Sequence, residues 1–442
     1  MSETVSEASG VTGRSKRVAS DPASGWSWVD RDIWTERMLA ALDNGVLGGK
    51  WFSLIDKVSR IETLRSGWQA VLKNKGAAGV DRVSVERFGS DAERYLAELS
   101  AEVQAGRYEP QAVRRVEIPK GDGKVRPLGI PCVKDRVVQA AVKRVIEPIF
   151  ERDFAQHSYG FRPGRGCKDA LRRVDALLKA GYVHVVDADL QGYFDSIPHD
   201  RLMAKLGNWI SDGRVLALIA SWLQQDIVHE VRRWTPSQGS PQGAVISPLL
   251  ANVYLHDLDV LLASRGDEMV RYADDFVILS RSADSAQAAL AAVREWVAAN
   301  GLLLHPEKTH VGDCRQAGQG FEFLGYRFEG GRRYVRKKSR MALRARIRAK
   351  TQRTRGAGLA RIIADLNPML RGWFNYFKHA WRGEFRNADG FVRRRLRSLL
   401  RKHRKRRGPG NRPADHRRWT NTFFANAGLF TMHEAYRCAS QS

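Results

Sequence analysis

The chain has 442 residues and is basic, with 74 Lys and Arg against 48 Asp and Glu and a net charge of +26. This length allows roughly two or three domains, and the charge predicts a polyanionic partner. The longest largely apolar run near the middle of the chain, 215–223, is far too short to span a bilayer, and the N-terminal sequence is not that of a signal peptide.

The cysteines are scattered along the chain without any C-x-x-C pair; they are Cys132, Cys167, Cys314 and Cys438. This spacing argues against a structural zinc site and against a disulfide framework, and it fits a reducing compartment. We therefore expect a cytoplasmic protein with no membrane partner.

The positive charge is concentrated at one end of the chain. Residues 331–442 contain 31 Lys and Arg and 5 Asp and Glu, whereas residues 1–330 contain 43 of each sign and are neutral. A run of charge is usually a solvated face, but a whole segment with this imbalance is better explained by binding of nucleic-acid phosphates.

Residues 1–30 are low in hydrophobic residues and are expected to be disordered. From residue 32 to about 100 the periodicity predicts helices, which a Gly- and Asn-rich segment at 74–79 interrupts. A strand at 113–118, a turn at 121–123 and the following residues 126–131 predict a hairpin, and 134–150 is expected to be an amphipathic helix.

From residue 183 the pattern predicts a β-α-β-β-α-β unit of the ferredoxin-like kind. The expected strands are 183–190, 268–272, 276–281 and about 302–311, and the expected helices are 249–264 and 284–300. A last apolar strand at 321–326 closes this block, and the chain beyond it is expected to be helical and basic.

Carboxylates lie at the end of two of these strands. Asp187 and Asp189 point to the same face because side chains alternate along a strand, and periodicity cannot choose between them. Asp274 and Asp275 lie at the tip of the 268–281 hairpin, where an Asp-Asp turn alone is most often only solvated. Acidic strands that converge, however, form an all-oxygen site suited to Mg²⁺, and two such ions are the usual apparatus of nucleotidyl transfer.

At this point the chain resembles the bacterial group II intron reverse transcriptases. Tyr-Ala-Asp-Asp at 272–275 matches the signature of reverse transcriptases, and Asp-Leu-Gln-Gly-Tyr-Phe-Asp at 189–195 resembles their first palm motif. The segments at 238–243, 246–252, 158–165 and 126–131 resemble further motifs of the group, in the family's order. Leu-Asn-Pro at 366–368, followed by 371–377, resembles its maturase domain, and 419–430 resembles the end of members that lack a C-terminal endonuclease domain.

The resemblance implies roles for individual residues. It selects Asp189, with Asp274 and Asp275, as catalytic metal ligands, and it adds the carbonyl of Leu190 as a ligand. Asp274 would bridge the metal ions and Asp275 would coordinate more loosely. Asp187 is then expected to support the site without binding metal directly.

The resemblance also implies a nucleotide site. Phe194 resembles the steric gate that excludes a 2′-hydroxyl, although a core aromatic is the plainer interpretation. Gln242 resembles the residue that contacts the sugar and phosphate region of the incoming nucleotide. Lys120 and Arg126 resemble the pair that binds the triphosphate, with Arg114 as a weaker third candidate.

The expected fold class is α+β, a right-hand polymerase with fingers and a ferredoxin-like palm followed by an α-helical basic thumb that is also the maturase domain. The expected divisions are a tail at 1–30, a helical extension with the start of the fingers at 31–100, fingers and palm at 101–330, and the RNA-binding thumb at 331–442. Aromatic side chains of the thumb are expected mainly inside it and arginines outside.

The expected function is RNA-directed DNA synthesis with two Mg²⁺ ions and dNTPs, together with binding of group II intron RNA to promote splicing and mobility. The further partners are an RNA template, a DNA or RNA primer and a DNA target. Two alternatives stay open: a reverse transcriptase domesticated for DNA repair or phage defence, and an RNA-binding splicing cofactor without polymerase activity.

Overall fold

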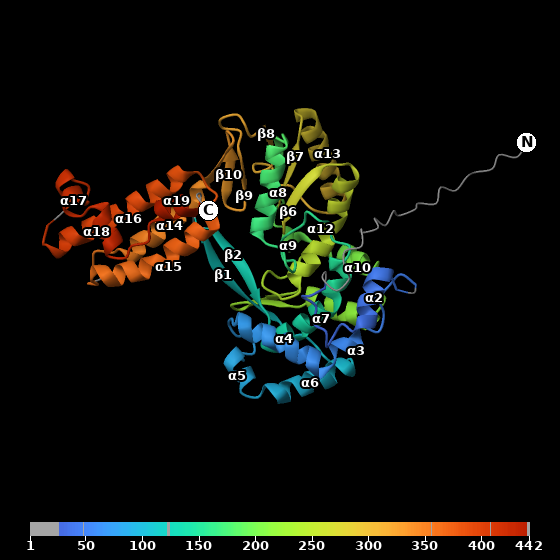
Figure 1. Ribbon diagram of the computed structural model, residues 1–442. Coiled ribbons are helices and arrows are strands. Elements are labelled where there is room, and N and C mark those ends of the chain that lie inside the picture. The colour runs from blue at the N-terminus through green and yellow to red at the C-terminus, as the bar shows by residue number, and fades with distance from the viewer. Residues whose placement is uncertain (1–25, 47, 122–123, 355, 407, 440–442) are drawn as a thin grey trace, which may run out of the picture. The chain divides into compact units, whose positions relative to one another are not determined.

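The computed structural model describes residues 26–46, 48–121, 124–354, 356–406 and 408–439 (Figure 1). The chain divides into two compact units, of which the first comprises Met1–Phe154 with Pro198–Val253 and the second Ala155–Ile197 with Tyr254–Ser442. In the described part of the chain, none of the helices has the length and apolar character needed to cross a membrane.

The first unit is mainly helical, and its centre is the pair α4 (Ile61–Asn74) and α7 (Val133–Glu151). Gly67 allows the two helices to approach closely, because a Cβ atom there would lie 2.8 Å from the carbonyl oxygen of Val137. The expected break after Asn74 is confirmed. The remaining helices are α2 (Glu36–Asn44), α3 (Ile55–Val58), α5 (Val85–Gly89), α6 (Ala92–Gln104), α10 (His199–Leu206) and α11 (Gly213–Leu223).

The sheet of the first unit contains the predicted hairpin. β1 (Val113–Gly121) and β2 (Lys124–Ile130) pair antiparallel, with an irregularity in register between Pro119 and Gly121. A second hairpin, β4 (Ile227–His229) and β5 (Arg232–Trp234), extends the sheet in the order β2-β1-β4-β5. The sequence did not indicate this second hairpin, because its strands are only three residues long.

The second unit contains a four-stranded antiparallel sheet that we call the palm sheet. Its strands are β3 (His184–Asp189), β6 (Glu268–Tyr272), β7 (Asp275–Ser280) and β8 (His310–Asp313), in the order β6-β7-β3-β8. With the helices α12 (Ser247–Ser264) and α13 (Ala283–Ala299) between the strands, this is the predicted ferredoxin-like arrangement. The hairpin formed by β6 and β7 is antiparallel and includes the pair Tyr272 and Asp275.

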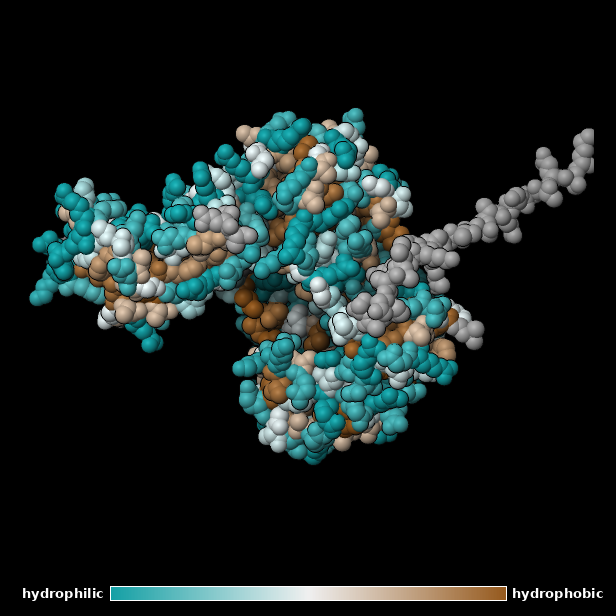
Figure 2. All heavy atoms as spheres, in the orientation of Figure 1, coloured by the Kyte–Doolittle hydropathy of each residue, from teal (hydrophilic) through white to brown (hydrophobic). Residues whose placement is uncertain are grey.

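The palm sheet shares its core with the C-terminal helices. Val185 and Leu279 lie in one hydrophobic cluster with α8 (Cys167–Lys179) and with apolar residues of the chain after 320. The segment after residue 320 begins with a small sheet of β9 (Phe321–Phe323), β10 (Tyr326–Glu329) and β11 (Arg332–Val335). It continues as α14 (Lys337–Lys350), α15 (Leu359–Phe377), α16 (Arg382–His403), α17 (Pro413–Arg418), α18 (Asn421–Asn426) and α19 (Met432–Ala439). The prediction of a helical C-terminal segment is confirmed, and Figure 2 shows many hydrophilic side chains projecting from these helices.

Three sequence-based boundaries were wrong. The strand expected at 302–311 is ordered as β8 only from His310, because 302–309 forms a loop that bridges to Leu190 through Leu304. The strand expected at 321–326 is split by a turn in which Leu324 and Gly325 both have positive φ, 48° and 85°. Residues 26–30, which were expected to belong to a disordered tail, instead form a turn in which Trp26 is buried; residues 1–25 lie outside the described residues.

Candidate active site

The predicted acidic residues are brought together at one end of the palm sheet. Asp189 on β3 lies directly opposite Asp275 on β7, and Asp187 lies opposite Val277. Side chains directly opposite each other share a face of a sheet, so Asp187, Asp189 and Asp275 lie on the same face. Asp274 occupies the turn between β6 and β7, next to this pair.

Two of these carboxyl groups are harder to ionise than ordinary aspartates. Burial, followed by the neighbouring carboxylates of Asp187 and Asp274, raises the pKa of Asp275 to about 7. Burial also raises the pKa of Asp187 to about 6, against the opposing effect of His310. A buried cluster of carboxyl groups in which negative charge is poorly neutralised is suited to a cation.

A lysine already supplies one positive charge. The Nζ atom of Lys308 lies 2.7 Å from Oδ2 of Asp189, and both side chains are about half exposed. Lys308 is not among the site residues expected from the sequence.

The donor set fits Mg²⁺ in its chemistry. As the side chains stand, the described residues contain no group of three or more His, Cys, Asp or Glu that is arranged to hold a metal ion. Carboxylates at the ends of two neighbouring strands are nevertheless the hard oxygen donors that Mg²⁺ requires.

The backbone around Leu190 is fixed on both sides. The carbonyl of Asp189 accepts a hydrogen bond from the amide of His305 at 2.7 Å, and the amide of Gln191 donates to the carbonyl of Leu303 at 2.8 Å. The role of the Leu190 carbonyl as a metal ligand stays a prediction. Asp187 accepts a hydrogen bond from the amide of Glu322 at 3.4 Å, which is consistent with the supporting role expected for it.

Phe194 lies close to the acidic residues in the sequence, on the short helix α9 (Tyr193–Ser196). Its side chain is 8% exposed, and its ring packs edge-on against Phe161 at 6.4 Å and Tyr193 at 5.6 Å between centroids. This packing is compatible with a core aromatic and with a gate, so the gate stays a prediction.

The predicted nucleotide-binding residues of the first unit are partly assembled. Arg126 on β2 donates from Nε to Oε1 of Gln242 at 2.7 Å, which joins two of the candidates. Arg114 instead donates twice to the carbonyl of Ala78, at 3.0 and 2.6 Å, so part of its donor capacity serves the fold. Lys120 lies in β1, but its side chain is outside the described residues.

The arginines of the C-terminal helices fall into two groups. The expectation that they lie outside was wrong for Arg397, which is 3% exposed and donates to the carbonyl of Trp419 at 2.9 Å. Arg401 is also buried and pairs with Asp415 at 2.8 Å. Arg395 donates to the carbonyl of Thr351 at 2.9 Å. Aromatic residues such as Phe374 are buried as predicted.

The exposed group converges on one ring. The guanidinium groups of Arg344, Arg348 and Arg394 lie 5.5, 5.5 and 5.3 Å from the centre of the Phe391 ring, and all three arginines are exposed. We call these three residues the arginine ring. Stacked guanidinium groups keep their in-plane donors available for phosphate.

Comparison with known proteins agrees with this geometry. The reverse transcriptase (RNA-dependent DNA polymerase) family matches residues 118–328, and the group II intron, maturase-specific domain matches residues 340–419. Protein YkfC of Escherichia coli is 34% identical over 336 residues, which are 65% of this chain and 84% of that protein. The group II intron-encoded protein LtrA of Lactococcus lactis is 36% identical over 195 residues, which are 43% of this chain and 32% of LtrA.

Among solved structures, a chain of the partial Cas6-RT-Cas1–Cas2 complex is 26% identical with a TM-score of 0.36, over 56% of this chain and 41% of that chain. The two family matches lie in the order palm, then C-terminal helices, and together they include the aligned carboxylates and the arginine ring. The chain belongs to the reverse transcriptases that carry a group II intron maturase-specific domain, and it is an RNA-directed DNA polymerase with maturase function.

Proposed function

We propose that Asp189, Asp274 and Asp275 are the catalytic carboxylates with which this polymerase extends a DNA or RNA primer on an RNA template. The observation that carries the proposal is the direct opposition of Asp189 and Asp275 across β3 and β7, with Asp274 in the adjoining turn. We further propose that the C-terminal helices bind the chain's own intron RNA and promote splicing and insertion into a DNA target. The cytoplasmic location stays a prediction.

Two Mg²⁺ ions would be held by these three carboxylates and the carbonyl of Leu190, and when bound they supply activation of the primer 3′-hydroxyl and neutralisation of the charge on the triphosphate. The chain's own residues provide the remaining functions. Arg126 and Gln242 would bind the phosphates and sugar of the dNTP, and Phe194 would limit the space beside the 2′ position. The poorly neutralised charge around Asp275 supports a cation-binding role for this end of the palm sheet.

The test is Asp274→Asn, which removes one negative charge without changing side-chain size. We expect primer extension on an RNA template to fall at least a hundredfold, which corresponds to about 2.7 kcal/mol in the activation free energy. Binding of structured RNA should stay within twofold of wild type, because the basic C-terminal helices are unchanged.

Asp284→Asn is the matched control, since Asp284 is an exposed carboxylate in the first turn of α13. It should leave both measurements unchanged. If Asp274→Asn retains more than about a hundredth of wild-type extension, the metal assignment is wrong. If the wild-type protein binds RNA but does not extend a primer, the chain is a splicing cofactor.

A further inference from the structure

The turn that carries Asp274 has an unfavourable backbone conformation. Tyr272 and Asp275 are the last paired residues of β6 and β7, so Ala273 and Asp274 are the two central residues of the turn. Ala273 has a φ of 61°, whereas Asp274 keeps a negative φ. This is the pattern of a type II′ turn, which favours glycine at the first central position. An alanine there requires support from its surroundings.

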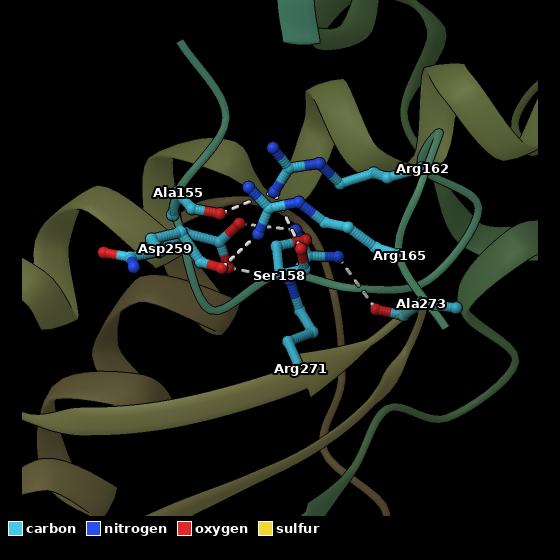
Figure 3. Close-up of polar contacts among 8 residues, drawn as sticks. Ala155, Ser158, Arg162, Arg165, Asp259, Arg271 and Ala273 are labelled. Atoms are coloured by element: carbon cyan, nitrogen blue, oxygen red, sulfur yellow. Dashed lines mark hydrogen bonds and ion pairs between the residues drawn. The ribbon is translucent and has the colours of Figure 1, made fainter. Parts of the chain in front are cut away.

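Arg271 provides a contact to this turn from the preceding strand (Figure 3). Its Nη1 atom donates to the carbonyl oxygen of Ala273 at 2.9 Å. The rest of the guanidinium group is held by Asp259 on α12, to which it donates from Nε at 2.7 Å and from Nη2. Both side chains of the pair are completely buried. Burial works to lower the pKa of Arg271, but the Asp259 carboxylate outweighs it, so the pKa is raised and the group stays charged.

The contacted carbonyl decides how Asp274 is oriented. Type I′ and type II′ turns differ by a flip of the central peptide plane, which here joins Ala273 to Asp274. A flip of that plane reverses the sign of φ at Asp274, and the rotamers open to a side chain depend on φ and ψ. A hydrogen bond to the Ala273 carbonyl therefore holds the turn in one of its two conformations and so selects the rotamers available to the Asp274 side chain.

The support comes from the face of the palm sheet opposite the catalytic carboxylates. Arg271 lies opposite Phe276 in the ladder, whereas Asp275 shares its face with Asp189. A buried guanidinium group on this side can fix the turn without occupying space needed by metal or substrate.

The preceding segment fixes the same turn through its backbone. The amide of Arg271 donates to the carbonyl of His157 at 3.0 Å, and its carbonyl accepts from the amide of Tyr159 at 2.8 Å. Gly160 lies against the turn so closely that a Cβ atom there would be 2.2 Å from the amide nitrogen of Ala273. The turn is thus held on several sides, and the side chain of Arg271 donates a hydrogen bond to its central peptide.

We propose that Arg271, oriented by Asp259, is a positioning residue that fixes the central peptide of the Ala273–Asp274 turn and thereby directs the Asp274 carboxylate toward the metal. This inference rests on the proposed function of Asp274 as a metal ligand. The buried Arg271–Asp259 ion pair, on the face of the palm sheet opposite the carboxylates, would thus help to determine the geometry of the active site.

The test compares Arg271→Lys with Arg173→Lys. The first variant keeps the charge but loses the planar fork that binds Asp259 and Ala273 at once. The second is a control on the neighbouring helix α8, where Arg173 pairs with Glu268 at the other end of β6, at 2.5 Å. Each purified variant is checked for cooperative thermal unfolding before the other measurements.

We expect Arg271→Lys to lower kcat for primer extension by about ten- to hundredfold, because a displacement of a catalytic group by about 1 Å costs up to this much. The KM for the dNTP should stay within twofold. Binding of Mn²⁺ to the protein–primer–template complex, followed by electron paramagnetic resonance without dNTP, should weaken at least threefold. Arg173→Lys should leave kcat and Mn²⁺ binding within twofold of wild type.

A second change tests the mechanism through the backbone. Glycine adopts positive φ without strain, so Ala273→Gly should make the turn less dependent on Arg271. The double variant Arg271→Lys/Ala273→Gly is therefore expected to recover at least fivefold in kcat and most of the Mn²⁺ affinity. A purely structural role of Arg271 would give recovery of the melting temperature alone.

Asp259→Asn serves as the second probe if Arg271→Lys does not fold, and it should change the same two measurements in the same direction. The inference is overturned if the folded variants match Arg173→Lys in kcat and Mn²⁺ binding, or if both variants fail to fold, since the pair would then determine the fold alone. Failure of this inference leaves Asp274→Asn inactive, whereas an active Asp274→Asn variant would overturn the proposed metal site itself.

Discussion

Phe194 combines a buried position with a place in the sequence five residues after Asp189. Its ring contacts the ring of Phe161, which is 44% exposed and has a φ of 60°. The two rings together therefore extend from the buried aromatic residues to the protein surface. An aromatic side chain in such a place can limit the space beside a bound sugar while it still contributes to the core.

Phe194→Ala should relax selection of the sugar. We expect the ratio of dNTP to rNTP incorporation efficiency to fall by about tenfold or more. One bulky contact that excludes a hydroxyl contributes up to a few kcal/mol of discrimination, and about 1.4 kcal/mol corresponds to tenfold. Phe194→Leu, which keeps most of the apolar volume, should show a smaller change. A lower melting temperature with an unchanged ratio would identify Phe194 as a core residue only.

At the scale of single residues, the sequence was sufficient to locate the site but not to identify all of its residues. Strand alternation put Asp187 and Asp189 on one face, as observed, yet only the motif distinguished them. Lys308 and Arg271 could not be assigned from periodicity, because the partner of each is distant in the chain or belongs to another element: Asp189 lies 119 residues from Lys308. An arginine within an apolar strand was the one available signal for Arg271, since burial of a charge requires a partner.

At the scale of elements, α14 and α16 form the surface best suited to RNA. The arginine ring joins them through the Phe391 side chain, whereas Arg395 and Arg397 bind backbone carbonyls within the fold. Basic residues on one segment of sequence therefore have two different functions, which composition alone could not separate.

Changing Arg344, Arg348 and Arg394 together to Gln should reduce the salt dependence of RNA binding. Each lost phosphate contact lowers the slope of log K against log salt by somewhat less than one, so a decrease of about two is expected. Arg37, Arg87 and Arg94, exposed arginines of the first unit, provide a control with the same loss of charge. Equal slopes for the two triple variants would show that the arginine ring is only a solvated surface.

Long elements were predictable and short ones were not. The helix predicted at 134–150 and the strands predicted at 183–190 and 268–272 agree with α7, β3 and β6, because each carries a clear periodicity or apolar run. The β4–β5 hairpin has three-residue strands and depends on pairing with β1, more than 100 residues earlier. Such pairing is a tertiary effect that local sequence does not encode.

At the scale of the whole molecule, the division of charge does not coincide with a division of the core. Residues after 330 carry all of the net positive charge, yet their apolar residues belong to the same hydrophobic cluster as Val185, Val277 and Leu279 of the palm sheet. The domain divisions expected from the sequence stay predictions, but a cut between the palm sheet and the C-terminal helices would pass through one core.

A chain truncated after residue 330 should therefore lose the folded second unit as well as its affinity for RNA. Removal of the C-terminal helices exposes large apolar side chains, and their burial contributes about 1.5–3 kcal/mol each. We expect low soluble yield and loss of cooperative unfolding by circular dichroism. A truncated protein that is soluble, melts cooperatively and fails only in RNA binding would contradict a shared core.

Because the core is shared, a ligand bound to the C-terminal helices should also stabilise the palm sheet. A ligand that binds only the folded form adds its binding free energy to the free energy of unfolding, about 2.7 kcal/mol at a concentration one hundred times the dissociation constant. RNA held by the arginine ring would thus slow amide hydrogen exchange in β3 and β7, whose strands carry Asp189 and Asp275. Bound RNA would then stabilise the strands that carry the proposed catalytic carboxylates.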